Sequence, residues 1–177
     1  VFQKAYVLYP DIPKGLLESV AHSNTHFQHI NPLTEAPSCL GLPSYHGVMG
    51  LVQDPSLFFR DNLALVVNLS DYNKYDIIQD PETNILAYAQ AFHLIKADLN
   101  IQSMAPEDHL PVLEVLSEIP NDGGLKNNFA FDSHIYSVLR NLNVPAFQQL
   151  VGRPSISVDL QKVFGLERYE LLSSAQI

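Results

Sequence analysis

Hydrophobic residues recur along this chain at the spacing of amphipathic helices, and a proline stands just ahead of most of these runs. Proline is tolerated in the first turn of a helix, because the N–H that it lacks would have no partner there. The prolines placed in this way are Pro13, Pro55, Pro81, Pro106, Pro145 and Pro154. Together with the hydrophobic spacing, these starts predict helices over residues 13–24, 55–69, 81–99, 108–119, 132–142, 145–151 and 157–164.

The run from Pro81 to Leu99 is the most regular of them. Its hydrophobic stripe consists of Ile85, Tyr88, Ala89, Phe92, Ile95 and Leu99, which follow one another at helical spacing. Asn84 and Lys96 fall mostly outside this stripe, so they are expected away from the interior. His93 borders the stripe, and a position at the edge of the core is the simplest interpretation for it.

The segment 107–120 predicts a buried helix with an acidic start and a proline stop. Asp108 suits the N-cap, because its carboxylate can accept a hydrogen bond from a backbone amide of the first turn. Glu114 and Glu118 lie one helical turn apart and are expected on a solvated face. The hydrophobic residues predicted to be buried together are Phe92, Leu113, Leu116 and Leu139.

Other stretches are less regular. Residues 4–9 fit either a strand or a short helix, and residues 75–78 fit a short strand or a loop. Residues 31–53 hold several prolines and glycines, which predict a long irregular connection at the surface. Residues 63–69 alone would suit a buried strand, but the preceding Asp54–Pro55 favours a helix start.

The sum is an all-α fold, a single helical domain over residues 1–177 with about seven or eight helices and an irregular stretch near 31–53. Composition agrees, because 177 residues fit one domain and 16% charged residues is a globular value. No apolar run approaches the ~18 residues that span a bilayer. The single cysteine, Cys39, cannot form an intrachain disulfide, which fits a reducing, cytoplasmic location.

The charge of the chain restricts its partners. Nineteen acidic residues against ten basic ones give a net charge of −9. Such a charge disfavours nucleic acid and anionic membranes and favours basic partners. A DNA-binding helix-turn-helix at residues 148–164, with its turn at 152–155, is an alternative that this charge opposes.

Three histidines form a candidate metal site. His22, His26 and His29 follow i, i+4, i+7 spacing, which would bring their ring nitrogens to one helix face as ligands for a transition metal. The intervening Ser23–Thr25 argues against a continuous helix, because short polar side chains compete for the backbone hydrogen bonds.

A metal-dependent enzyme built on these three histidines is therefore a second alternative. His46, His93 or His134 would supply further ligands or catalytic groups. No metalloprotease, paired Glu-x-x-His or nucleophile motif accompanies them. The sequence otherwise gives no reason to expect a cofactor.

One stretch also resembles a known family. Residues 100–103 lead into Glu107-Asp108-His109-Leu110-Pro111 and an apolar helix, a pattern that resembles the NarJ/TorD family of redox-enzyme maturation chaperones. Leu8-Tyr9-Pro10-Asp11 is similar to the early Tyr-Pro-Asp of that family, and the helix-loop-helix layout of residues 110–142 is similar too. The resemblance implies a cytoplasmic, all-helical, non-enzymatic protein. Such proteins bind the twin-arginine leader of a molybdenum-dependent oxidoreductase until its cofactor is inserted.

The resemblance also indicates where this basic leader peptide would bind. The implied contacts are Glu107, Asp108 and His109, with Tyr9 and Asp11 as weaker candidates. An acidic surface suits such a ligand, because carboxylates accept two hydrogen bonds from one guanidinium group. The apolar part of a leader would need a hydrophobic groove between helices.

Overall fold

The computed structural model describes residues 1–31, 43–56, 58–120, 123–152 and 156–174. Helix makes up 62% of the structure and strand 4%, so the all-α prediction is confirmed. Over these ranges there are ten α-helices, more than the seven or eight predicted. None of them is both long and apolar enough to cross a membrane.

The helices follow one another from α1 to α10 with one short hairpin between α2 and α3. Their bounds are α1 Phe2–Leu8, α2 Leu16–Thr25, α3 Asn62–Leu69, α4 Lys74–Gln79, α5 Pro81–Asp98, α6 Leu110–Leu116, α7 Leu125–Leu142, α8 Pro145–Leu150, α9 Leu160–Phe164 and α10 Leu166–Ser173. A 3-10 turn, η1, covers Pro106–His109 just before α6, and the hairpin pairs β1 (Tyr45–His46) with β2 (Leu51–Val52).

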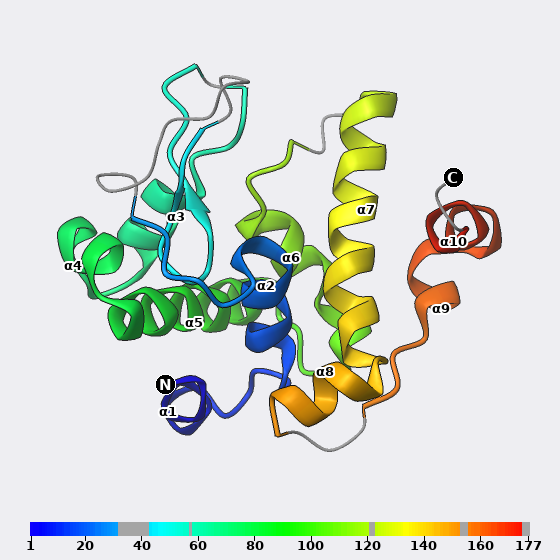
Figure 1. Cartoon of the computed structure of the whole chain (residues 1–177), viewed down its shortest axis with the longest axis horizontal. Helices are drawn as coiled ribbons and strands as arrows, with labels where there is room; N and C mark the ends of the chain where they lie inside the picture. Colours follow the sequence, from blue (N-terminus) through cyan, green and yellow to red (C-terminus); the bar gives the residue numbers. More distant parts are fainter. Residues whose placement is uncertain (32–42, 57, 121–122, 153–155, 175–177) are drawn as a thin grey trace.

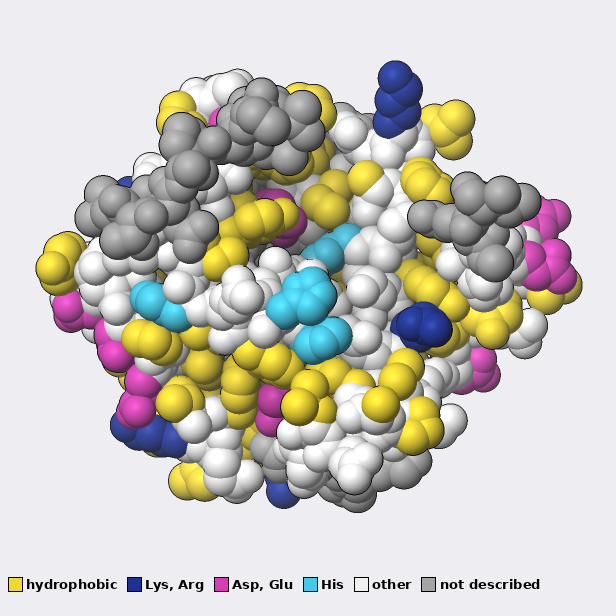
Figure 2. Space-filling view, in the orientation of Figure 1, with side chains coloured by type: hydrophobic (Ala, Val, Ile, Leu, Met, Phe, Trp, Pro, Cys, Tyr) yellow, Lys and Arg dark blue, Asp and Glu magenta, His cyan; other side chains and the backbone are white. Residues whose placement is uncertain are grey.

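Figure 1 shows how these elements are arranged. Helix α5 crosses the lower left beneath the hairpin, α2 lies in front of the centre, and α7 stands upright beside it. Helices α2 and α7 pack against each other, and α1, α3 and α4 pack on α5. The space-filling view from the same side shows the surface hollowed between the part that carries the hairpin and α7 (Figure 2).

Helix α5 is the central helix of the fold. Pro81 occupies its first turn, as the sequence predicted, and Asp80 caps it by accepting a hydrogen bond from the Thr83 amide. Its interior face is wider than the predicted stripe. Asn84 and Lys96 are buried, whereas Leu99, predicted to be inside, is 41% exposed just past the helix end.

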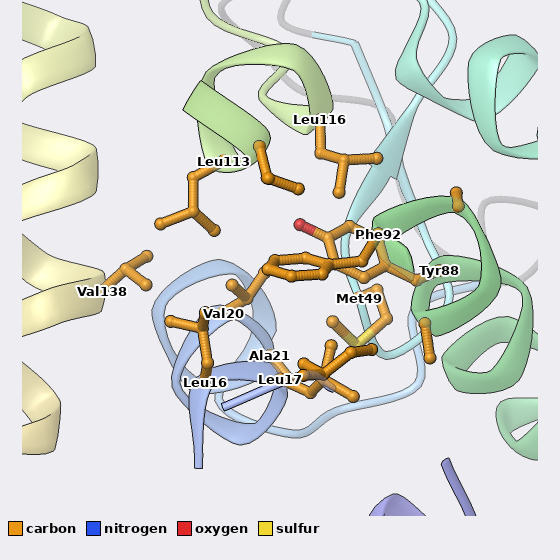
Figure 3. Close-up of a cluster of buried hydrophobic side chains, with 14 of the residues drawn as sticks. Leu16, Leu17, Val20, Ala21, Met49, Tyr88, Phe92, Leu113, Leu116 and Val138 are labelled. Carbon is orange, nitrogen blue, oxygen red and sulfur yellow. The ribbon is translucent and has the colours of Figure 1, made fainter. Parts of the chain in front are cut away.

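The core gathers side chains from α2, α5, α6 and α7 around Phe92. Phe92, Leu113, Leu116 and Leu139 are each at most 3% exposed and belong to one hydrophobic cluster, so their joint burial is confirmed. Figure 3 shows Leu113 and Leu116 reaching down from α6 onto Phe92, with side chains of α2 below. Burying a side chain of this size fully stabilises the fold by about 1.5–3 kcal/mol.

Several predicted boundaries were wrong because of local hydrogen bonds. Asp54 does not start a helix; its carboxylate accepts from the amides of Ser56, Phe58 and Phe59, which closes a loop. Helix α3 starts only after Asp61, which accepts from the Ala64 amide.

Four other helices differ from expectation, and one open alternative is decided. Residues 74–79 form helix α4, capped by Asn73, where a short strand or a loop was expected. Residues 2–8 form a helix, which decides between the two alternatives for that segment. Helix α7 begins at Leu125, seven positions before the predicted start at 132. Helices α2 and α9 start later than predicted, at Leu16 and Leu160.

The hairpin is held against α5 by one buried side chain. Asn84 accepts a hydrogen bond from the Met49 amide at 2.8 Å and donates to the Ile77 carbonyl at 3.0 Å. At Gly47 a Cβ atom would lie 2.1 Å from the Asn84 side-chain nitrogen, so only glycine fits. Part of the stretch predicted to be irregular is therefore a fixed hairpin, while residues 32–42 lie outside the described part of the chain.

Candidate functional site

Two residues pack against the end of helix α6: Arg60, from the loop before α3, and Asn62, the first residue of α3. The Arg60 guanidinium donates to the carbonyls of Glu114 at 2.7 Å and Val115 at 2.6 Å. The Asn62 amide donates to the Leu116 carbonyl at 2.8 Å. These are carbonyls that a helix end leaves without an intrahelical partner. The cap therefore stops the helix at Leu116, three residues earlier than predicted.

The chain then continues in an extended conformation into the interior. Ser117 has φ −70° and ψ 143°, and the Glu118 carbonyl accepts from the Arg60 backbone amide at 2.8 Å. Glu118 is only 4% exposed. The expectation that Glu118 lies on a solvated helix face one turn after Glu114 was wrong, because the helix has already ended.

Three side chains from distant parts of the chain interact with the Glu118 carboxylate. Tyr45 of β1 donates a hydrogen bond to it at 3.3 Å. The charge of Glu118 also influences the pKa of Tyr88 on α5 and of His134 on α7. We call Glu118, Tyr45, Tyr88 and His134 the Glu118 cluster.

The titration behaviour of the cluster reflects burial and one negative charge. Burial, followed by the Glu118 charge, raises the pKa of both Tyr45 and Tyr88 well above the usual range. Burial lowers the pKa of His134, and the Glu118 charge partly offsets this effect. Both tyrosines therefore stay protonated at neutral pH, and His134 is biased toward its neutral form.

The elements that carry the cluster border the hollow of the surface. The members of the cluster come from the hairpin, from α5, from α7 and from the connection between α6 and α7. These elements surround the hollow, in which Figure 2 shows acidic, histidine and hydrophobic side chains together. The Tyr88 hydroxyl points away from α5 (Figure 3). Tyr45 is 36% exposed, so part of its ring remains accessible.

Glu118 is unusual because its charge is not balanced. Within the described ranges, no lysine or arginine pairs with it. A buried carboxylate costs stability unless it is paired or well hydrogen-bonded. Titratable groups perturbed by burial and by one specific charge, beside a hollow, are typical of functional sites. The arrangement can accept hydrogen bonds at Glu118 and can donate one from Tyr88, whereas the Tyr45 hydroxyl already donates to Glu118 and can accept another.

The residues predicted to bind a leader peptide lie elsewhere, around the C-terminal end of α5. Asp11 lies 2.9 Å from the His93 ring nitrogen and 3.7 Å from the Lys96 ammonium. Lys96 also donates to the Asp11 carbonyl. Tyr9 packs against His93 with ring centres 5.3 Å apart. The carboxylate of Asp11 is therefore already paired with a lysine of the same chain.

The second predicted segment, η1, is divided between surface and core. Asp108 is exposed, bonds to the Ser103 side chain and lies 3.4 Å from the Lys162 ammonium, and these bonds lower its pKa. His109 is completely buried, donates from Nδ1 to the Ala105 carbonyl at 2.9 Å and stacks on Phe92. Asp108 also does not provide the predicted N-cap of α6, which begins after His109.

The structure does bring the two predicted segments together. Burial lowers the pKa of His109, and the charges of both Lys96 and Asp11 act on that ring. Glu107 has one carboxylate oxygen that is buried without a hydrogen-bond partner. Peptide binding at this place stays a prediction, and it would involve carboxylates of which two already pair with lysines.

The predicted histidine cluster is not assembled. Helix α2 ends at Thr25, and His26 and Phe27 have φ of 53° and 64°, so the chain leaves the helical path. The rings of His22 and His26 lie 5.1 Å apart, but His29 lies close enough to Asp80 to influence its pKa. Among the described residues, no group of three or more His, Cys, Asp or Glu is placed to hold a metal ion.

The helix-turn-helix alternative falls partly outside the described residues. Its turn includes positions 153–155, which the structure does not describe. Of the flanking segments, α8 ends at Leu150 and α9 is a five-residue helix.

Sequence reasoning identified the members of the Glu118 cluster only singly. Tyr88 was expected in the core, His134 was a possible group of a metal enzyme, and Glu118 was expected in solvent. Pro120 disfavours a helical conformation only for Ile119, the residue before it, so no local signal indicated that the helix ends before Glu118. No protein-family model, curated protein or solved structure matches this chain, so its resemblance to the NarJ/TorD family stays a prediction.

Proposed function

We propose that this chain binds an uncharged, hydroxyl-bearing ligand, a carbohydrate chain, at the Glu118 cluster. The observation that carries the proposal is the Glu118 carboxylate, which is 4% exposed and has no basic partner among the described residues. A ligand that donates hydrogen bonds to Glu118 would add to the one that Tyr45 supplies. Hydrogen bonds to a charged group contribute about 1.5–3 kcal/mol each.

The charges around the cluster favour a neutral ligand. Glu118 repels phosphate and carboxylate groups, and no lysine or arginine pairs with it to offset this. The other polar groups of the cluster are two tyrosine hydroxyls and an imidazole biased toward its neutral form. Such groups both donate and accept hydrogen bonds, as sugar hydroxyls do. The half-exposed Tyr45 ring adds an apolar surface on which the flat face of a sugar can rest.

The cluster favours binding over glycoside cleavage. Most glycosidases use two carboxylates on opposite sides of the bond that breaks. Glu118 is the only carboxylate whose charge acts on the described residues of this cluster. We therefore expect the ligand to be held and not shortened.

Isothermal titration calorimetry with soluble oligomers of N-acetylglucosamine and of glucose tests the proposal. Both probes carry hydroxyls. Only the N-acetylglucosamine oligomer also carries amide N–H groups, which can donate a hydrogen bond to a carboxylate. We expect the protein to bind at least one of them and Glu118→Gln to weaken binding by at least about tenfold, because 1.4 kcal/mol corresponds to one such factor. Tyr45→Phe should weaken it less, since the ring remains.

The matched control is Glu167→Gln, an identical change at an exposed position of α10. It should leave binding unchanged. If neither oligomer binds, or if Glu118→Gln binds as tightly as the native chain, the proposal is wrong. Shortened oligomers after incubation would replace binding by cleavage as the function.

A second proposal keeps the basic leader peptide as partner of Glu107, Asp108 and His109. The observation favouring it is that Asp11 and His109, from the two segments that resemble the chaperone family, lie close enough for their charges to interact. The pairing of Asp11 with Lys96 and of Asp108 with Lys162 makes this the weaker proposal, because an incoming arginine would compete with both lysines.

A further inference from the structure

We propose that Arg60 is the positioning residue for Glu118, because it prevents helix α6 from continuing through that residue. The inference deepens the proposed function, since it concerns the same site. Its geometric basis does not depend on which ligand binds there.

Arg60 occupies two carbonyls that a longer α6 would need for its own hydrogen bonds. In an α-helix the amide of each residue donates to the carbonyl four positions earlier. A continued α6 would therefore bond the amide of Glu118 to the carbonyl of Glu114 and the amide of Ile119 to that of Val115. These two carbonyls are the ones that accept from the Arg60 guanidinium, at 2.7 and 2.6 Å.

Whether these two carbonyls are occupied decides whether Glu118 is buried or lies on the outer face of a longer helix. With the carbonyls taken, the chain turns into the extended conformation that buries Glu118 beside Tyr45. With the carbonyls open, the helix can extend, and Glu118 would then lie one turn after Glu114 on the outer face. Arg60 suits this task, because its planar group has several donors in a fixed fork whereas a lysine has one compact ammonium.

The loop that carries Arg60 is itself fixed. Asp54 closes the turn at residues 54–59 through three backbone amides. Asn62 accepts from the Val52 amide at 2.6 Å while donating to the Leu116 carbonyl. The same loop therefore connects strand β2 with the end of α6, so the hairpin that carries Tyr45 and the segment that carries Glu118 share one support.

The test follows the pKa of His134 by proton NMR, because this ring lies within reach of the Glu118 charge. Glu118→Gln is the reference variant, and it should lower the His134 pKa, since the Glu118 charge raises that pKa. Arg60→Gln should lower the pKa by most of the same amount, because Glu118 has moved away. The sign is decisive: removing the positive charge of Arg60 alone would raise the pKa of a histidine.

Two further variants complete the experiment. Arg140→Gln removes a positive charge from an exposed position of α7 and should not lower the His134 pKa. Arg60→Lys keeps the positive charge but loses the planar pair of N–H donors, so it should lower the His134 pKa by an intermediate amount. If Arg60→Gln does not fold, the His134 pKa of Arg60→Lys serves as the test of the proposal. An unchanged or raised His134 pKa in the folded Arg60 variants overturns the proposal. Because no sugar is present, this outcome is independent of whether a carbohydrate binds.

Discussion

Helix α6 has an acidic residue near each end, and the two are held in opposite ways. Before its first turn, Asp108 is exposed and lies 3.4 Å from the Lys162 ammonium. Beyond its last turn, Glu118 is buried, with a tyrosine hydroxyl as its hydrogen-bond partner. A paired surface carboxylate is an ordinary part of a protein surface. A buried carboxylate with no basic partner costs stability, and that cost makes the C-terminal end the better candidate for function.

The largest expected effect comes from the helix that joins the two ends. Leu116→Ala should lower the free energy of unfolding by about 2–5 kcal/mol, because Leu116 is 1% exposed and its truncation leaves a cavity. Denaturant melts measure it. Leu125→Ala, at a side chain 87% exposed, is the control and should stay within about 0.5 kcal/mol. A similarly small loss for Leu116→Ala would mean that α6 is not anchored in the core.

Neutralising Asp108 and Glu118 in turn tests whether the two carboxylates differ in their effect on stability. Glu118→Gln should raise the free energy of unfolding at neutral pH by about 1 kcal/mol, because it removes a buried charge at a functional site. Asp108→Asn should not stabilise the protein, since that carboxylate already has a basic partner. Melting both variants beside the native chain gives the answer. If Glu118→Gln is clearly destabilising, the C-terminal carboxylate is a structural group and the contrast fails.

These expectations show what the sequence alone can and cannot provide. The start of helix α5 was predicted correctly, because Pro81 marks it locally in the chain. The burial of Phe92 and Leu116 followed from their spacing. The end of α6 did not follow, because its cap comes from Arg60, 54 positions earlier than the carbonyl of Glu114. The three-histidine site failed for a local reason, the left-handed conformation at His26.

A smaller effect is expected from pH. Burial lowers the pKa of His109 near one end of α6 and of His134 beyond the other. A group whose pKa is lower in the folded state than in the unfolded state contributes stability above its unfolded pKa, about 6.5 for histidine. That contribution is lost as the pH falls through 6.5 toward the folded value. Denaturant melts between about pH 8 and pH 5 should therefore show stability decreasing toward the acid side.

The same melts distinguish the two ends. The Glu118 charge raises the pKa of His134, so Glu118→Gln should make the native pKa of His134 lower still and the loss on acidification larger. Any stability gained by Glu118→Gln at neutral pH should consequently shrink as the pH falls. A gain that is constant with pH would show that Glu118 and His134 do not interact.

The smallest effect is expected at the exposed end. A twin-arginine leader peptide should bind near Asp108 weakly, and added salt should weaken it further, because exposed charges are screened. Asp108→Asn should reduce this binding without unfolding the protein. The measurement is a titration of the peptide and of its two-lysine variant against both proteins. Equal binding of all four pairs, or none, would remove the N-terminal end of α6 as a peptide site.

The attachment of the hairpin to α5 has a consequence for local unfolding. Two strands of two residues each would open readily if only their own ladder held them. Asn84 is completely buried, and its side chain accepts from the Met49 amide and donates to the Ile77 carbonyl. The Met49 amide can therefore exchange with solvent only when its contact with the central helix is broken. The hairpin that carries Tyr45 is therefore expected to open together with its contact to α5, and not through its own ladder alone.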